Sequence, residues 1–232
     1  MPIAKPLKQM LRRQLSRLRR DQPALLIFLF HALFENQREI DAHQLDPQQR
    51  ITLEHMREFI LYFQRAGYEF PAPDRLSSDL KPAGKYVLIT FDDGYFNNLR
   101  MLPLLRELGV PAVFFISTTN VRRQECFWWD VVHRERYKQG IPRAEISREQ
   151  KQLKRLHHRQ IRHHLIDAFG ADCLDPWSDT DRPMTIPELQ TFAAEPLVYI
   201  GNHTSDHYIL DNYPEPEVIQ QIRQGQAELE QI

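Results

Sequence analysis

The 232-residue sequence predicts an α/β fold built around parallel strands, and three observations support this. Apolar, β-branched runs at 86–90 and 112–116 show no alternation, which is typical of strands covered on both faces. A helical pattern at 99–108 lies between them, and a strand, a helix and a strand within about 30 residues form a parallel unit. Hydrophobic residues make up 42% of the chain and charged residues 26%, an ordinary balance for a globular protein.

The chain starts with a basic segment. Residues 1–20 hold seven basic residues and no acidic one, and their leucines recur at helical spacing. The apolar run at 24–30 is too short to span a bilayer, and no small-residue cleavage site follows it. We therefore predict a basic N-terminal helix over residues 1–24 that packs on the domain edge, and then a buried strand at 25–30. A signal anchor and peripheral contact of residues 1–20 with an anionic membrane surface are the less favoured alternatives.

The remaining elements follow from periodicity. Residues 52–67 predict a helix with Thr52 as its N-cap, although no clean capping box follows. Residues 120–182 are polar, charged and helical, and we interpret them as an insertion on the scaffold. A short apolar run at 198–200 predicts another strand, and residues 215–232 predict a helix that runs to the end of the chain.

Charge and cysteine content narrow the functional classes. The net charge of −1 and the isoelectric point of about 6.8 argue against a globally basic nucleic-acid binder. Two cysteines, Cys126 and Cys173, do not make a disulfide framework and fit either a reducing compartment or two buried thiols. Because no convincing signal peptide is present, we expect a cytoplasmic protein, with membrane association through residues 1–20 left open.

Two aspartates follow the predicted strand at 86–90. Asp92 and Asp93 are costly at the end of a buried strand unless a cation compensates them. Successive side chains of an extended segment point opposite ways, so one carboxylate can reach a metal while the other faces a substrate water. Gly94 permits the sharp turn that follows, and a plain polar turn is the alternative.

Two histidines follow the predicted strand at 198–200. His203 and His207 are four residues apart, which is ligand spacing on one helical turn. Neutral imidazoles suit Zn, Co, Ni or Fe, and two histidines with one aspartate leave open positions, as catalytic sites do. Surface histidines are the alternative if this pair is taken alone. However, the aspartate pair and the histidine pair each follow a predicted strand, and the carboxyl ends of parallel strands meet at one edge of the sheet.

These motifs resemble the polysaccharide deacetylase family, which shares the NodB homology domain (carbohydrate esterase family 4). The run Thr90 to Gly94, TFDDG, is similar to the family's first motif, and His203-Thr204-Ser205-Asp206-His207 is similar to its second, H-[S/T]-x-x-H. The resemblance covers about residues 25–230. It implies a distorted (β/α) barrel in which residues 120–182 are a helical insertion.

The resemblance also implies residue roles. Asp92 would be the general base, and Asp93, His203 and His207 would hold a divalent metal, most often Zn²⁺ and sometimes Co²⁺ or Ni²⁺. Such a cation lowers the pKa of a bound water, and an adjacent ionised carboxylate takes its proton. We expect Asp206, between the two histidines, to be solvated rather than to orient an imidazole.

Part of the family pattern is not found after His207. It includes an R-x-P-[Y/F] motif, an aspartate and a histidine that serves as the catalytic acid. The sequence stops at Ile232 inside a helical pattern. We therefore expect residues 25–232 to be a partial domain that lacks something like ~80 residues of a ~250–300-residue barrel.

The implied activity is removal of N-acetyl groups from amino sugars of a polysaccharide or of its lipid-linked or nucleotide-sugar precursor. An O-acetyl esterase or another amide hydrolase, and a carbohydrate-binding module without turnover, are the alternatives. Tyr95, His31, Trp128 and Trp129 are weaker candidates for substrate contact. Packing against the core or the rim is the alternative for His31 and for the two tryptophans.

Overall fold

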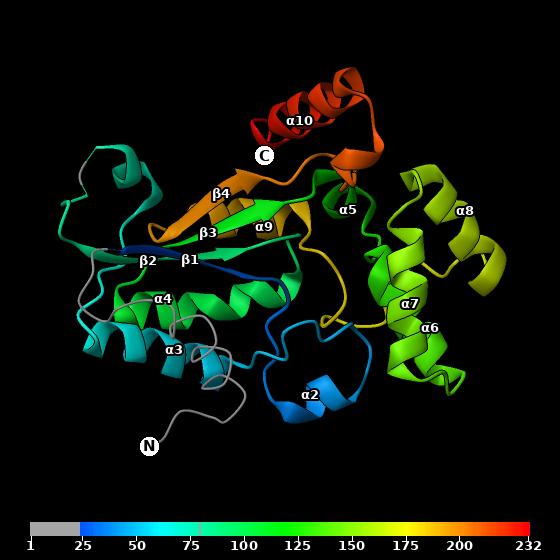
Figure 1. Cartoon of the computed structure of the whole chain (residues 1–232), viewed down its shortest axis with the longest axis horizontal. Coiled ribbons are helices and arrows are strands. Elements are labelled where there is room, and N and C mark those ends of the chain that lie inside the picture. Colours follow the sequence, from blue (N-terminus) through cyan, green and yellow to red (C-terminus); the bar gives the residue numbers. More distant parts are fainter. Residues whose placement is uncertain (1–23, 79) are drawn as a thin grey trace.

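A computed structural model describes residues 24–78 and 80–232 (Figure 1). One sheet contains four parallel strands in the order β1-β2-β3-β4. The strands are β1 (Ala24–Phe30), β2 (Lys85–Phe91), β3 (Ala112–Ile116) and β4 (Val198–Asn202). The α-helices are α2 (Gln37–Asp41), α3 (Leu53–Arg65), α4 (Leu102–Leu108), α5 (Thr118–Arg123), α6 (Trp128–Lys138), α7 (Arg143–Leu153), α8 (His158–Phe169), α9 (Ile186–Ala193) and α10 (Glu215–Leu229). Short 3₁₀ helices span Pro73–Ser77, Phe96–Met101 and Leu210–Asn212.

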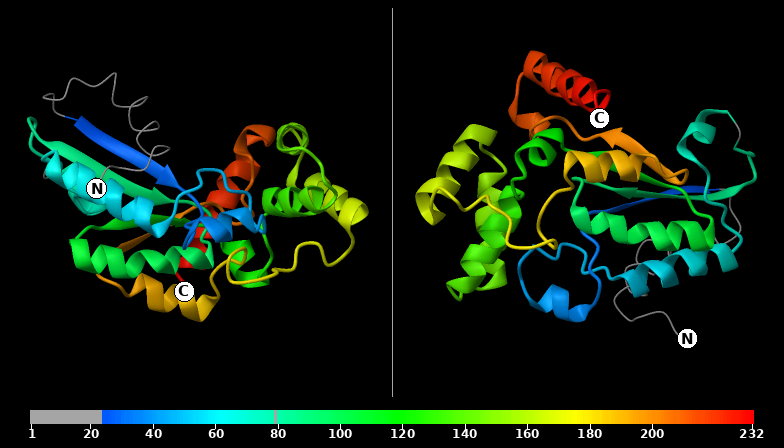
Figure 2. Two further views of the ribbon diagram at one scale, coloured as in Figure 1. Left: turned by 90° about the horizontal axis from the view of Figure 1, so that it is seen from below. Right: turned by 180° about the vertical axis from the view of Figure 1, so that it is seen from behind.

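The sheet is singly wound. The spatial order of its strands follows the chain order, and helices α3, α4 and α9 lie side by side along one face (Figure 2, left). A barrel winds its strands in the same progressive way. The predicted parallel α/β class is therefore confirmed, and in the described residues the sheet is open, an arrangement compatible with an incomplete barrel.

Helix α3 anchors the core beneath the sheet. Its buried stripe is the predicted one, Met56, Phe59, Ile60 and Phe63, and all four side chains are fully buried. Thr52 is the N-cap, but here the prediction was incomplete, because a capping box is present. The Thr52 side chain accepts from the His55 amide, and the His55 ring accepts from the Thr52 amide. Histidine fills the place that glutamate or glutamine usually takes.

Strand β1 differs from its prediction. It was expected to be buried, yet Leu25, Ile27 and Leu29 are 40%, 60% and 45% exposed. Strand β1 pairs only with β2 in the described part of the chain, so it is an edge strand. Its other side-chain row, which includes Phe28 and Phe30, packs on α3 through ring contacts with Phe59. An unbroken apolar run therefore did not distinguish an edge strand from a central one.

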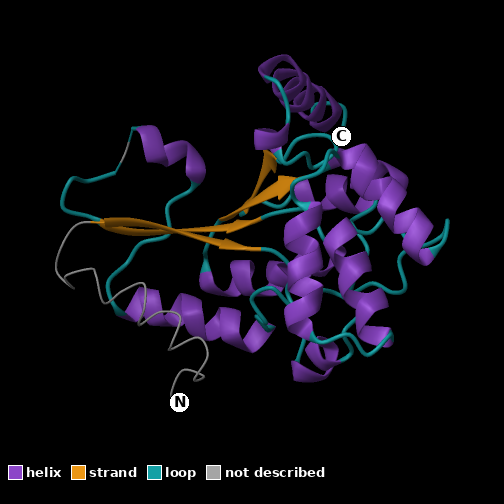
Figure 3. Ribbon diagram, turned by 45° about the vertical axis from the view of Figure 1, so that its right-hand side comes forward, coloured by secondary structure: helices purple, strands orange, loops and turns teal. Residues whose placement is uncertain are grey.

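A second apolar cluster lies beyond the carboxyl ends of the strands. It joins α6, α7 and α8 and contains Trp128 and Trp129. In Figure 3 the strand arrowheads point toward the side where these helices gather. A fully buried ion pair, Arg134 Nη1 to Asp181 Oδ2 at 2.5 Å, ties α6 to the segment that leads into α9. The helical character expected for residues 120–182 is present, and their status as an insertion stays a prediction.

Residues 1–23 lie outside the described part of the chain, and so does the expected basic helix over residues 1–24 except for its last residue. The contact of residues 1–20 with a membrane surface likewise stays a prediction. Among the described helices, none combines the length and the apolar character that a bilayer crossing requires.

Candidate metal centre

The two predicted motifs meet at the carboxyl ends of β2 and β4. The backbone of each motif is fixed to a neighbouring strand. The Asp92 amide donates to the Phe30 carbonyl at 2.9 Å, and the His203 amide donates to the Ile116 carbonyl at 3.0 Å. The Asp93 carbonyl accepts from the Ser117 amide at 3.1 Å. The ends of adjacent strands thus hold both loops at one edge of the sheet.

The backbone around the site adopts uncommon conformations. Asp93 has a φ of 81° and His207 a φ of 52°, in the left-handed region that disfavours side chains other than glycine. Gly94 follows with a φ of 93°, and a Cβ there would lie 3.1 Å from Ile116 Cδ1. Such strain persists where the surroundings enforce it, and it is concentrated at functional sites. Here it turns Asp93 into the space that His207 faces.

Three potential ligand atoms converge. The Nε2 atoms of His203 and His207 lie 3.1 Å apart, and Asp93 Oδ1 is 3.0 Å from His207 Nε2 and 3.5 Å from His203 Nε2. Asp92 Oδ2 lies farther out, 3.9 Å from His203 Nε2. The structure thus brings together the three residues expected to be ligands and places the expected base beside them.

The two aspartates have opposite electrostatic surroundings. Burial, and next the charge of Asp93, raise the pKa of Asp92 to about 6. Burial would also raise the pKa of Asp93, but the hydrogen bond with His207 and the charges of the nearby histidines hold it below its usual value. Burial, followed by the charge of His207, lowers the pKa of His203 to about 4. A neutral imidazole is the form that binds a metal.

Helix α10 holds the loop that carries the histidines. Gln221 is the principal contact: its Oε1 accepts from the Asp206 amide and its Nε2 donates to Asp206 Oδ2, both at 2.8 Å. Thr119 donates to the other Asp206 oxygen at 2.7 Å. Asp206 was expected to be solvated. It is instead half-buried and hydrogen-bonded through both carboxylate oxygens, to Thr119 of α5 and Gln221 of α10. Within the described residues, Asp206 makes no hydrogen bond to the ring of His203 or of His207.

Close packing of α10 depends on a glycine. A Cβ at Gly225 would lie 2.6 Å from Asn202 Oδ1 and 2.9 Å from the Thr204 carbonyl carbon. Glu228 accepts from Ser205 Oγ at 2.9 Å and from Thr118 Oγ1. Sequence reasoning missed these contacts. The signal was an isolated glycine inside a helical pattern, which often marks a close approach.

A cavity of about 430 Å³ opens beside the cluster. Asp93 and His207 line it, and so do three of the weaker candidates for substrate contact, His31, Trp128 and Trp129. Both tryptophans are nearly buried and belong to the helical cluster, so they anchor α6 and also form the cavity wall. The Trp129 ring lies against the His207 ring, with 4.7 Å between their centroids.

Tyr95 occupies a different position from the other candidates. It is fully buried, and its hydroxyl donates to Asp130 Oδ2 at 2.6 Å and accepts from Trp129 Nε1 at 3.0 Å. Its expected contact with substrate stays a prediction, since in this structure it supports Trp129. Sequence reasoning missed Asp130, whose buried carboxyl has a pKa well above its usual value because of desolvation. No motif marks this residue.

The cluster fits a divalent cation. Asp93, His203 and His207 form a group whose ligand atoms all lie within 4.8 Å of one another. Asp93 Oδ2 is buried and has no hydrogen-bond partner among the described residues, so the carboxylate retains an unused acceptor. Two imidazole nitrogens and one carboxylate oxygen are a common donor set for Zn²⁺ and related ions with open positions.

Comparison with known proteins gives a consistent result. The family model for polysaccharide deacetylase matches residues 79–168, a range that includes Asp92 and Asp93 and ends before His203. No curated protein matches the chain. Three solved structures are similar in fold. They are the deacetylase PplD of Streptococcus pyogenes in complex with acetate, a putative polysaccharide deacetylase from Bacillus anthracis, and a polysaccharide deacetylase from Bacillus cereus.

The likeness to these structures covers most of this chain. It covers 90% of this chain and 70% of the streptococcal protein, at 16% identity and a TM-score of 0.53. The likeness to the Bacillus anthracis and Bacillus cereus proteins covers 89% of this chain and 46% of each of theirs, at 14% identity. The TM-scores are 0.51 and 0.52, respectively. The chain thus spans less than half the length of the two Bacillus proteins.

The parallel sheet, with its motifs at the strand ends, defines an α/β protein whose fold is similar to that of solved deacetylases. The resemblance to the polysaccharide deacetylase family that the two motifs predicted is confirmed, both by the family match and by the fold.

Proposed function

We propose that the chain is a metal-dependent hydrolase that removes N-acetyl groups from amino sugars of a polysaccharide or of its precursor. The observation that supports this most is the convergence of Asp93, His203 and His207 next to Asp92, at the edge of a cavity. The fold of deacetylases and the family match at residues 79–168 support the same conclusion.

Asp93, His203 and His207 would hold the cation, for which Zn²⁺, Co²⁺ and Ni²⁺ suit the donors. When bound, a divalent cation lowers the pKa of water and polarises a carbonyl oxygen. Asp92, whose pKa burial raises to about 6, would remain ionised beside such a cation and so be able to accept a proton.

The chain's own residues then carry the proton transfer. Water adds to the carbonyl carbon of the acetamido group, and Asp92 accepts the proton that the water loses. The carbon–nitrogen bond breaks as the nitrogen takes up a proton from solvent, Asp92 returns its proton to solvent, and the products are acetate and a free amine. Trp128, Trp129 and His31 border the space beside the cluster and exclude water from one side of the substrate.

Acetate release tests this function. The chain, supplied with Zn²⁺ or Co²⁺, is incubated with N-acetylated and O-acetylated amino sugars, and acetate and free amine are quantified. We expect release from the N-acetylated sugars in equal amounts of acetate and amine. Asp92→Asn should lower kcat by a factor on the order of 10² to 10⁴ and leave bound metal unchanged, because the base is lost and the ligands remain.

Asp211→Asn is the matched control, because Asp211 is an exposed aspartate outside the cluster. It should retain full activity. Acetate release that does not depend on Asp92, or release from O-acetylated sugars alone, would contradict the proposed function.

A further inference from the structure

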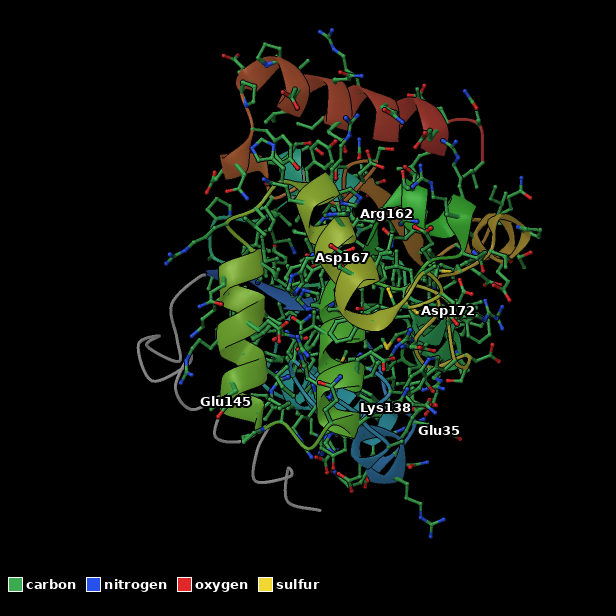
Figure 4. The ribbon with its side chains drawn as sticks, turned by 90° about the vertical axis from the view of Figure 1, so that its right-hand side faces the viewer. Glu35, Lys138, Glu145, Arg162, Asp167 and Asp172 are labelled. Atoms are coloured by element: carbon green, nitrogen blue, oxygen red, sulfur yellow. The ribbon has the colours of Figure 1, made fainter. Side chains whose placement is uncertain are left out.

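The cavity has a second wall that the proposed chemistry does not use. Five residues from α7 and its C-cap line it: Arg143, Ser147, Gln150, Lys151 and Lys154. Their spacing of three and four residues places them on one side of the helix, and we call this set the α7 face. Figure 4 looks onto the side of the molecule where α6, α7 and α8 lie, with Glu145 near the start of α7. The cavity therefore extends from Asp93 and His207 to a helix surface that bears three cationic side chains.

Only one of these cations is neutralised. Arg143 Nη2 lies 2.6 Å from Asp46 Oδ1, and Gln150 Nε2 donates to the other Asp46 oxygen at 2.8 Å. Lys151 and Lys154 are exposed, and within the described residues neither has a carboxylate partner. The α7 face itself contains no acidic residue.

The acidic residues of α7 are directed elsewhere. Glu149 forms an ion pair with Arg136 and lies 3.2 Å from His164 Nε2, and Glu145 is exposed and does not line the cavity. A ligand in the cavity therefore meets two ammonium groups without a carboxylate partner, in addition to Asp93 and His207 of the metal-binding cluster.

This arrangement restricts the ligand. A volume of about 430 Å³ lies within the usual range for a small-molecule site. A neutral sugar chain leaves the two lysines without a partner, whereas a phosphate offers several oxygens to strongly hydrated point charges such as ammonium groups. We propose that the substrate is an N-acetylated amino sugar that carries a phosphate or diphosphate group, held by Lys151 and Lys154 while its acetamido group lies at the metal-binding cluster. This inference rests on the proposed function, whose substrate class it specifies.

Binding, measured by titration calorimetry on the metal-free chain, tests the inference independently of turnover. The probes are methyl N-acetylglucosaminide, N-acetylglucosamine 1-phosphate, UDP-N-acetylglucosamine and a water-soluble short-chain prenyl diphosphate of the same sugar. We expect the phosphate-bearing probes to bind at least about tenfold tighter than the neutral sugar, a difference of 1.4 kcal/mol. The advantage should decrease as salt is added. Tighter binding of the nucleotide or of the prenyl form would indicate which carrier the site accepts.

Charge-matched variants locate the effect. The double variant Lys151→Gln, Lys154→Gln should lose the preference for phosphate, while binding of the neutral sugar stays as it was. The control is Arg148→Gln with Arg155→Gln, which removes the same charge from exposed positions of the same segment that do not line the cavity. It should retain the preference.

Two results would overturn the inference. One is equal affinity for neutral and phosphate-bearing sugars in the wild type, and the other is an equal gain from a carboxylate-bearing sugar such as N-acetylmuramic acid. The test also separates the two proposals. Acetate release without a preference for phosphate would refute only the inference, whereas a preference for phosphate that depends on the two lysines, without acetate release, would refute only the hydrolytic function.

Discussion

Asp92 and Asp93 are neighbours in the sequence but occupy different environments. Asp93 is fully buried, turned inward by a φ of 81°, and hydrogen-bonded to His207. Asp92 is also buried, but its Oδ2 lies farther out, 3.9 Å from His203 Nε2. The alternation of side chains along a strand predicted two separate tasks. The positive φ that sets their directions was not predictable, because no local pattern requires it at an aspartate.

A buried chain of hydrogen bonds supports the wall behind His207. We predict that Tyr95→Phe lowers the free energy of unfolding by about 1–3 kcal/mol, because it leaves Asp130 Oδ2 and Trp129 Nε1 buried without this partner. Denaturant titration measures the loss. Because Trp129 lies against His207, we also expect a fall in kcat larger than the change in KM.

Tyr62→Phe is the control for this substitution. Tyr62 is half-buried on α3, and its hydroxyl has no recorded hydrogen bond in the described part of the chain. The control should change stability by no more than about 0.5 kcal/mol. If both tyrosine variants were equally stable, the hydroxyl of Tyr95 would not have the supporting role described here.

At the scale of elements, the position of the histidine loop depends on α10. The loop contributes two potential ligands, and its backbone has a positive φ at Thr204 and at His207. Gln221 and Gly225 hold this loop by hydrogen bonds and by close approach. Formation of the metal-binding cluster is therefore coupled to the docking of a helix that follows it in the chain.

Gly225→Ala tests this coupling. Alanine is the better helix former by about 1 kcal/mol, so an isolated helix would gain stability. Here the added Cβ would lie 2.6 Å from Asn202 Oδ1 and 2.9 Å from backbone at Thr204. We predict a net destabilisation of about 1–3 kcal/mol and weaker binding of Co²⁺, followed by its absorption spectrum.

Gln220→Ala provides the comparison, because Gln220 is exposed on the same helix. It should leave stability and Co²⁺ binding within error of the wild type. A Gly225→Ala protein that is more stable than the wild type and binds Co²⁺ equally well would show that α10 does not hold the loop.

Elements were predictable to the extent that their signals are local. The strands at 86–90 and 112–116 and the stripe of α3 followed from residue pattern alone, and the structure confirms them. The exposure of Ile27 did not follow, because it depends on which strands lie beside β1. The capping box at Thr52 was missed because a histidine ring replaces the usual acceptor.

At the scale of the whole molecule, the candidate site lies between two apolar clusters. The first cluster joins the sheet to α3, α4 and α9, and the second joins α6, α7 and α8. The strand ends carry the aspartates and histidines, while the helical layer provides Trp129 and the α7 face. The sequence motifs predicted the first half of this site. In the second half, Trp129 was a candidate for substrate contact, but the α7 face was not predicted, because no motif marks the residues of that helix.

The central claim is that two distant loops form one metal site. The most direct measurement is the metal content of the purified chain by mass spectrometry, with wild type, His203→Ala and His163→Ala compared. His163 is an exposed histidine on α8 and serves as the control. We predict about one divalent ion per chain in the wild type and in the control, and its loss in His203→Ala. A folded wild type without a bound ion after incubation with Zn²⁺, or a His203→Ala variant that retains the ion, would contradict the account.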